Sequence, residues 1–313
     1  MAKIDVHHHV LPQFFRDAQT AGGYPSTAYR DFPDWSPATS LALMDRLDIA
    51  TSMVSFSAPG IWYGDAAATA DLARRCNDYL VECREKHPGR FGGFACLPLP
   101  DVDASLREIE RAMDTLKLDG FVHLTHVDNR FAGHADYAPV YDELNRRQAV
   151  VFLHPTYPPK AAERDYPTPR PIVDYPCETT RAVTHLLFTG TLERCPDIRF
   201  IVSHAGGALT VLAHRIALFD ELTPHRRKYP GGAMRYLRRL YYDTALSGDS
   251  AVLTALQALV GPTQILFGTD YPYIPDSIAE SETRGTDAHA GFTAGTRAMM
   301  EHGNAKALFP RLR

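Results

Sequence analysis

Three consecutive histidines, His7, His8 and His9, lie in an apolar run near the start of the chain. Flanking residues such as Val6 and Val10 are β-branched, which is typical of a short buried strand. Because successive side chains of a strand point to opposite faces, His7 and His9 share one face and His8 takes the other. Two imidazoles on one face could bind a metal ion, or they could simply be polar core residues. We expect His8 to pack against a helix.

Other residues that commonly bind metals stand where further apolar runs end. A single histidine in such a place is most often a hydrogen-bonded polar residue, but several strand ends of this kind point to a shared site. Turn-forming proline or glycine follows three of them, at Pro155, Gly206 and Pro272. Three imidazoles and one carboxylate suit a divalent ion such as Zn²⁺, with a position left open for water or substrate. The residues at these ends are His123, His126, His154, His204 and Asp270.

Eight short apolar runs, mostly separated by helical patterns, would have to bring these residues together. Strand alternating with helix eight times predicts an α/β protein of the (β/α)8 TIM barrel type. In such a barrel the carboxyl ends of all eight strands meet at one mouth. The predicted strands are 3–10, 51–57, 90–98, 120–126, 149–155, 198–204, 240–245 and 264–270, and the clearest predicted helices are 71–86, 104–116, 178–195 and 250–260.

We expect residues 1–313 to form a single barrel domain, because nothing in the sequence resembles a linker. Two segments predict long loops over the mouth of the barrel. Residues 12–36 are rich in glycine, proline and aromatic residues, and residues 155–176 contain seven prolines.

Composition narrows the classes of partner. The formal net charge of −4 gives no basic excess, which argues against binding to nucleic acid or to an anionic membrane surface. No apolar run is long enough to span a membrane, and the N-terminus lacks a signal-peptide pattern. The five cysteines are scattered and form no CxxC motif, so reduced thiols in a cytoplasmic protein are expected.

Four motifs in this order resemble the amidohydrolase superfamily: HxH at 7–9, HP at 154–155, SHxGG at 203–207 and GTDxP at 268–272. More closely, the chain is similar to the decarboxylase branch, which includes aminocarboxymuconate-semialdehyde decarboxylase and the salicylate- and resorcylate-type decarboxylases. The segments TTRAV (179–183), TGTLERCPDIRFIVSHAGG (189–207) and YYDTALS (241–247) look most like 6-methylsalicylate-decarboxylase-like members. The resemblance extends from Ile4 to about Pro275.

The resemblance implies a site for one metal ion. Its expected ligands are His7, His9, His154 and Asp270, and His204 is the expected catalytic acid/base. Binuclear members use a carbamylated lysine at the end of strand four, and the corresponding segment GFVHLTH has no lysine. Zinc is the expected ion, with manganese as the alternative.

The activity implied is non-oxidative decarboxylation of a 2-hydroxybenzoate-type acid or a related unsaturated acid. Asp270, beside the metal, would protonate the ring carbon, and His204 would stabilise or accept charge on the hydroxyl. A hydrolase such as a lactonase could use the same site, with Asp270 as the base. A barrel that keeps the metal only for structure is the third alternative, although structural zinc sites are usually closed by their own four ligands.

The expected partner is a small anionic organic molecule, and the expected assembly is a homo-oligomer such as a dimer. Amides at the start of a helix opened by Gly206 and Gly207 would favour an anionic group. Trp62 and Tyr63 are candidates to pack on a flat ring, or they could pack in the rim or at a subunit contact. His126 could contact substrate or could be a solvated loop histidine.

Overall fold

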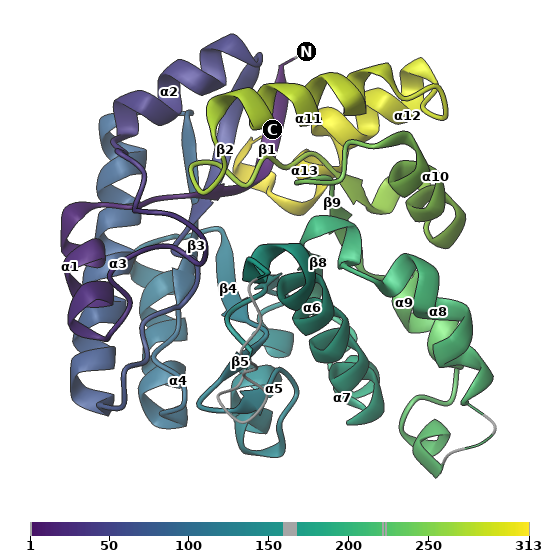
Figure 1. The fold of residues 1–313 in the computed structure, drawn as a ribbon. Helices are drawn as coiled ribbons and strands as arrows, with labels where there is room; N and C mark the ends of the chain where they lie inside the picture. Colours follow the sequence, from purple (N-terminus) through teal and green to yellow (C-terminus); the bar gives the residue numbers. More distant parts are fainter. Residues whose placement is uncertain (1, 159–167, 221, 223, 313) are drawn as a thin grey trace.

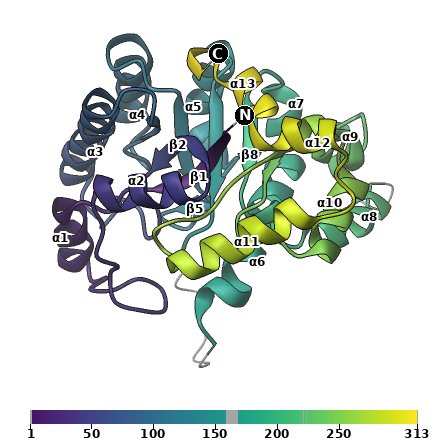
Figure 2. The same cartoon turned by 90° about the horizontal axis from the view of Figure 1, so that it is seen from above.

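The computed structural model describes residues 2–158, 168–220, 222 and 224–312. Eight strands form one parallel sheet in the order β1-β2-β3-β4-β7-β8-β9-β10, and helices surround it (Figures 1 and 2). The predicted TIM barrel is therefore confirmed. Its strands are β1 Lys3–His9, β2 Ile49–Ser55, β3 Phe91–Cys96, β4 Gly120–Leu124, β7 Val150–His154, β8 Arg199–Val202, β9 Tyr241–Asp243 and β10 Ile265–Leu266.

The first and last strands meet at a seam that has no continuous ladder of paired residues. Single backbone hydrogen bonds cross it instead, from Val6 N–H to the Phe267 carbonyl (2.9 Å) and from His9 N–H to the Tyr271 carbonyl (2.7 Å). The amide of Asp270 donates to the His7 carbonyl at 2.8 Å. The seam thus lies between the two segments that carry His7, His9 and Asp270.

Capping side chains fix where several of the outer helices begin. Ser36 forms a capping box with Thr39 at the start of α2, and Asp101 accepts from the amide of Ala104 at the start of α4. The α-helices are α1 Gln13–Ala21, α2 Pro37–Arg46, α3 Ala66–Lys86, α4 Val102–Glu110, α5 Ala138–Arg146, α6 Arg170–Phe188, α7 Thr191–Arg194, α8 Leu209–Leu218, α9 Ala233–Leu237, α10 Ser250–Leu259, α11 Asp276–Ala288, α12 Ala294–Ala298 and α13 Asn304–Leu308.

Short helical turns complete the secondary structure. Two are π-helical, η1 Arg111–Thr115 and η7 Met299–Gly303, and each extends an α-helix. The others are 3₁₀ turns: η2 Ala135–Tyr137, η4 His204–Gly206, η5 Pro224–Lys228, η6 Pro262–Gln264 and η8 Pro310–Leu312. In the part of the chain that the structure describes, no helix combines the length and hydropathy needed to cross a membrane.

Several predicted boundaries differ from those of the structure, and three of them concern segments near the barrel mouth. The expected loop 12–36 contains helix α1, which buries Phe15 and Gln19, four residues apart on one face. The expected loop 155–176 is helical from Arg170 onward, because proline is compatible with a first helical turn; residues 159–167 lie outside the described residues. The fourth strand ends at Leu124 instead of 126, since His126 begins a separate hairpin of β5 His126–Val127 and β6 Arg130–Phe131.

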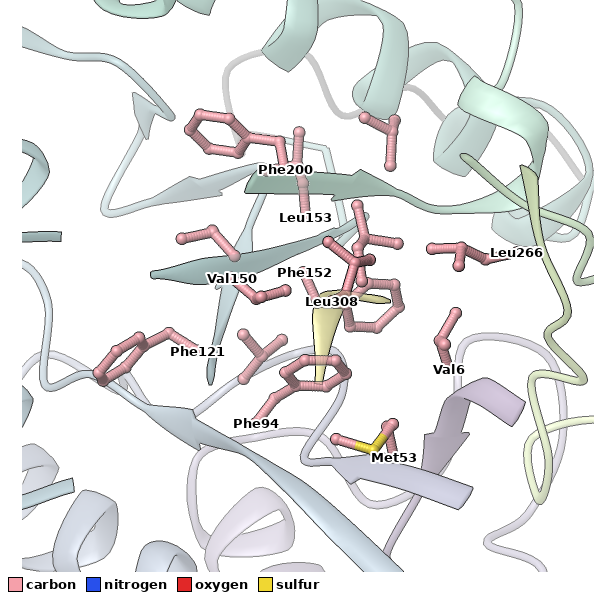
Figure 3. Close-up of a cluster of buried hydrophobic side chains, with 14 of the residues drawn as sticks. Val6, Met53, Phe94, Phe121, Val150, Phe152, Leu153, Phe200, Leu266 and Leu308 are labelled. Atoms are coloured by element: carbon pink, nitrogen blue, oxygen red, sulfur yellow. The ribbon is translucent and has the colours of Figure 1, made fainter. Parts of the chain in front are cut away.

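Large apolar side chains fill the interior of the barrel beneath its mouth. Figure 3 shows Val6, Phe94, Phe152 and Leu266 gathered between the strands. The rings of Phe94 and Phe152 stack with centroids 5.4 Å apart, and the Phe152 ring lies 4.9 Å from the ring of His7. The histidines at the strand ends therefore rest on an apolar floor.

Candidate metal centre

Four side chains from three separate regions of the sequence converge at the barrel mouth. His7 and His9 come from β1, His154 ends β7, and Asp270 follows β10. Their candidate ligand atoms all lie within 4.8 Å of one another, and all four residues are buried. His8 points the other way and contacts Ser40 of α2 at 2.9 Å, which confirms that it packs against a helix.

Each of the three histidines is hydrogen-bonded through Nδ1, and His9 Nε2 also contacts a fellow candidate ligand, lying 3.1 Å from Asp270 Oδ1. His7 Nδ1–H donates to Asp243 Oδ2 (2.8 Å), and His154 Nδ1–H donates to the Pro155 carbonyl (2.7 Å). Since a carboxylate and a carbonyl only accept, Nδ1 carries a hydrogen in both rings, and Nε2 is the nitrogen that can bind an ion. His9 Nδ1 is likewise engaged, by Ser55 Oγ at 3.0 Å. Among the described residues, the buried Nε2 of His154 has no hydrogen-bond partner, and His7 Nε2 lies 3.1 Å from Asp270 Oδ1, which is the arrangement expected of metal ligands around a shared centre.

The charges at the centre favour a cation. Burial alone would raise the pKa of Asp270, but His7, His204 and His9 hold that pKa well below its usual range, so Asp270 is a carboxylate. Burial lowers the pKa of His9 to about 4 and lowers that of His154, which keeps both imidazoles neutral.

His7 is the exception among the imidazoles. Burial lowers its pKa, but the Asp243 and Asp270 carboxylates outweigh this effect and raise the pKa to about 10. A site that attracts a proton so strongly also attracts a metal ion, and binding the ion must displace that proton. The donor set and its electrostatics therefore fit one divalent ion held by three histidines and an aspartate.

His204 lies beside this group but is not part of it. Its Nε2 is 3.5 Å from Asp270 Oδ2, and its buried Nδ1 has no hydrogen-bond partner in the part of the chain that the structure describes. The backbone at His204 is left-handed, with φ of 54°, and Ala205, Gly206 and Gly207 continue with positive φ into α8. Such backbone is unfavourable for residues with a Cβ and is concentrated at functional sites. The two glycines do precede a helix, as expected.

Asp243 is a functional candidate that the sequence reasoning missed. It ends β9 and is fully buried. Its Oδ2 accepts from His7 Nδ1–H, while its Oδ1 accepts from the amides of His204 (2.9 Å) and Ala245 (3.0 Å). One carboxylate thus orients a metal ligand and anchors the backbone of the adjacent histidine. Its position near the end of the predicted strand 240–245 was the available signal.

Trp62, Tyr63 and His126, the three predicted substrate contacts, line one cavity of about 390 Å³ beside the metal centre. The four candidate ligands are not in its wall. Two wall residues lie close to them in sequence: Phe56 directly follows Ser55, the partner of His9, and Thr156 lies two residues after His154. His126 Nε2–H donates to the Tyr157 carbonyl at 2.6 Å, and the side chain is only 11% exposed, so His126 is not a solvated loop residue. The remaining cavity walls are mostly apolar or aromatic, and include Ile61, Leu97, Leu99, Val122, Leu124 and Tyr157.

The fold and the site define the class of protein: an eight-stranded barrel with three histidines and an aspartate at its carboxyl mouth is a metal-dependent protein of the amidohydrolase type. The chain belongs to the amidohydrolase family, whose model matches residues 4–311. Among its relatives, 6-methylsalicylic acid decarboxylase acuB of Aspergillus aculeatus is 39% identical over 99% of this chain and 97% of that protein. The 6-methylsalicylic acid decarboxylase of Penicillium expansum is 37% identical over 100% of this chain and 98% of that protein.

The fold is shared with solved structures. One is a dihydroxybenzoic acid decarboxylase from Polaromonas, determined with bound manganese and the inhibitor 2-nitroresorcinol. It superposes with a TM-score of 0.79 at 23% identity, over 100% of this chain and 98% of that one. At 23% identity, this similarity is evidence for a shared fold alone.

Proposed function

We propose that the protein is a metal-dependent, non-oxidative decarboxylase of hydroxybenzoate-type aromatic acids. The observation that carries this proposal is the full-length identity of 37–39% to two 6-methylsalicylic acid decarboxylases, in a chain that has the complete histidine and aspartate set. The substrate is a small, flat acid, and the cavity lined by Trp62 and Tyr63 is the proposed location of its ring.

His7, His9, His154 and Asp270 would hold the ion. When bound, the ion would supply positive charge for the substrate carboxylate and its ortho oxygen. The Phe152 ring lies 4.9 Å from the His7 ring and gives the donor set an apolar floor. Asp243 keeps the His7 ring in its required tautomer through the 2.8 Å hydrogen bond to Nδ1.

Protonation of carbon is the step that the side chains must perform. Asp270 delivers a proton to the ring carbon that bears the carboxylate, which interrupts aromaticity. The carbon–carbon bond to the carboxylate then breaks, its electron pair restores the aromatic ring, and CO₂ leaves. Because Asp270 is ionised in the free site, it must first receive a proton, and His204 Nε2, 3.5 Å from Asp270 Oδ2, is the proposed source. His204 also stabilises the charge that develops on the substrate hydroxyl.

The identity of the ion is a separate proposal. Three imidazoles and one carboxylate suit zinc, which we keep as the expected ion at one per chain. Manganese is the alternative, because a structurally similar decarboxylase was determined with manganese bound. Elemental analysis of the purified protein distinguishes the two and also counts the ions per chain; two ions per chain would contradict a mononuclear site.

The test of the reaction is a product analysis in D₂O. The metal-loaded protein is incubated with salicylate, 6-methylsalicylate and 2,6-dihydroxybenzoate, and in parallel with a panel of lactones and esters. We expect CO₂ and a phenol that carries one deuterium at the former carboxylate carbon, as measured by mass spectrometry and NMR. Asp270→Asn should yield no product even where some metal remains, because an amide does not donate this proton efficiently. Opening of a lactone or ester without any release of CO₂ from the acids would show that the site performs hydrolysis.

A further inference from the structure

A buried series of hydrogen bonds runs from helix α2 to the back of the metal centre. His8 Nδ1–H donates to Asp5 Oδ2 at 3.0 Å, so His8 Nε2 carries the lone pair and accepts from Ser40 Oγ–H at 2.9 Å. Ser40 Oγ in turn accepts from Trp35 Nε1–H at 2.9 Å. Asp5, His8 and Ser40 are fully buried, and Trp35 is 5% exposed. One assignment of hydrogens therefore satisfies every member of the series.

Asp5 connects this series to both sides of the barrel seam. Its Oδ1 accepts from the amide of His7 at 2.9 Å and from the amide of Thr269 at 3.1 Å. Its Oδ2 accepts from Thr269 Oγ1–H at 2.6 Å in addition to His8. His7 is a candidate metal ligand, and Thr269 directly precedes the ligand Asp270. A single carboxylate thus holds the backbone on either side of the seam.

The seam makes this connection important, because no continuous ladder fixes the relative position of its two sides. The regular strand β10 ends at Leu266, four residues before Asp270, and Asp270 itself has a positive φ of 67°. A buried carboxylate that accepts four hydrogen bonds resists displacement, since any lost bond would leave a buried donor unsatisfied. The spacing between Asp270 and the two β1 histidines therefore depends on Asp5.

We propose that Asp5 and His8 are positioning residues that hold the two halves of the metal centre at coordination distance, and that Ser40 and Trp35 fix the orientation of His8. The proposal rests on the metal site of the proposed function, but not on the reaction carried out there. His8 thereby acquires a role although it binds no metal: it supports the centre from the opposite face of β1.

The test measures metal affinity with a chromophoric zinc chelator as competitor. Asp5→Asn and His8→Leu should raise the dissociation constant for Zn²⁺ by roughly 10–100-fold, the usual effect of removing a partner that orients metal ligands. His8→Asn should recover part of the affinity, because its amide can still donate to Asp5. Ser40→Ala should have the smallest effect, since it removes only the outer end of the series.

Asp119→Asn is the matched control. Asp119 directly precedes β4 at the other end of the barrel, its side chain is 5% exposed, and its Oδ2 accepts from the amide of Gly93 at 2.9 Å. This variant should lower Tm but leave zinc affinity unchanged. The proposal fails if folded His8→Leu and Ser40→Ala bind zinc as the wild type does, or if Asp119→Asn weakens zinc binding as much as His8→Leu. Because the readout is affinity, failure here leaves the D₂O test of decarboxylation unaffected, and the converse also holds.

Discussion

Among single residues, His204 differs from the candidate ligands in its distance from their common centre. Its Nε2 lies 3.5 Å from Asp270 Oδ2, and His204 belongs to no candidate ligand group among the described residues. We therefore expect His204→Asn to retain its full metal content while turnover falls by roughly 10²–10⁴-fold, the usual contribution of a positioned acid or base. Elemental analysis and steady-state kinetics on the same preparation check both halves. Loss of the ion in this variant would make His204 a ligand instead.

The strand-end residues were predictable because strand geometry fixes where their side chains point. Alternation along β1 separates His7 and His9 from His8, and the structure has this arrangement. The tautomers of these histidines and the residues that hydrogen-bond to them from outside the ligand set were not predictable, since they depend on residues far away in sequence. Asp243 orients His7 from more than two hundred residues away, and only the folded barrel brings the two within 2.8 Å.

Among the elements, the turn that carries His204 is the most constrained. Gly207 has φ of 63°, and a Cβ added there would lie 2.2 Å from the carbonyl oxygen of Pro176 in α6. Gly207→Ala must therefore move either the turn or the helix, and we expect a loss of more than about 1 kcal/mol in stability together with reduced turnover. Thermal melts and kinetics would show both effects.

Gly89→Ala is the control for backbone strain alone. Gly89 also has positive φ, 78°, but open space surrounds the position where its Cβ would be. It should lose some stability and keep its turnover. Equal effects of the two substitutions on turnover would contradict a specific contact between the turn and α6.

The sequence pattern predicted strands better than the segments that connect them. A barrel strand is a short apolar run with a turn after it, so local composition nearly suffices to locate it. Proline-rich segments are harder, because the same residue that disfavours a helix interior is favoured in the first turn. Helix α6 begins with Arg170 and Pro171 and also contains Pro176, so its first part looked like a loop.

For the molecule as a whole, the ion would join the first and last strands of the barrel. Anything that binds only the folded state stabilises it by mass action, by about 2.7 kcal/mol at a free concentration one hundred times the dissociation constant. We therefore expect added Zn²⁺ to raise Tm of the metal-free protein by several degrees and a chelator to reverse the shift. His154→Ala, which lacks one ligand, should show no shift. An equal shift in that variant would mean that zinc stabilises the protein from another place.

Because the metal ligands lie on both sides of the seam, they become available at different times during synthesis. His7 and His9 are synthesised before Asp270, which follows only after seven further barrel strands have been made. A nascent chain therefore carries an incomplete set of donors until the last barrel strand has been made, and it cannot bind an ion tightly until the barrel has closed. Bound metal therefore indicates that the barrel is complete, and a chain that ends before the eighth barrel strand lacks the full set of ligands.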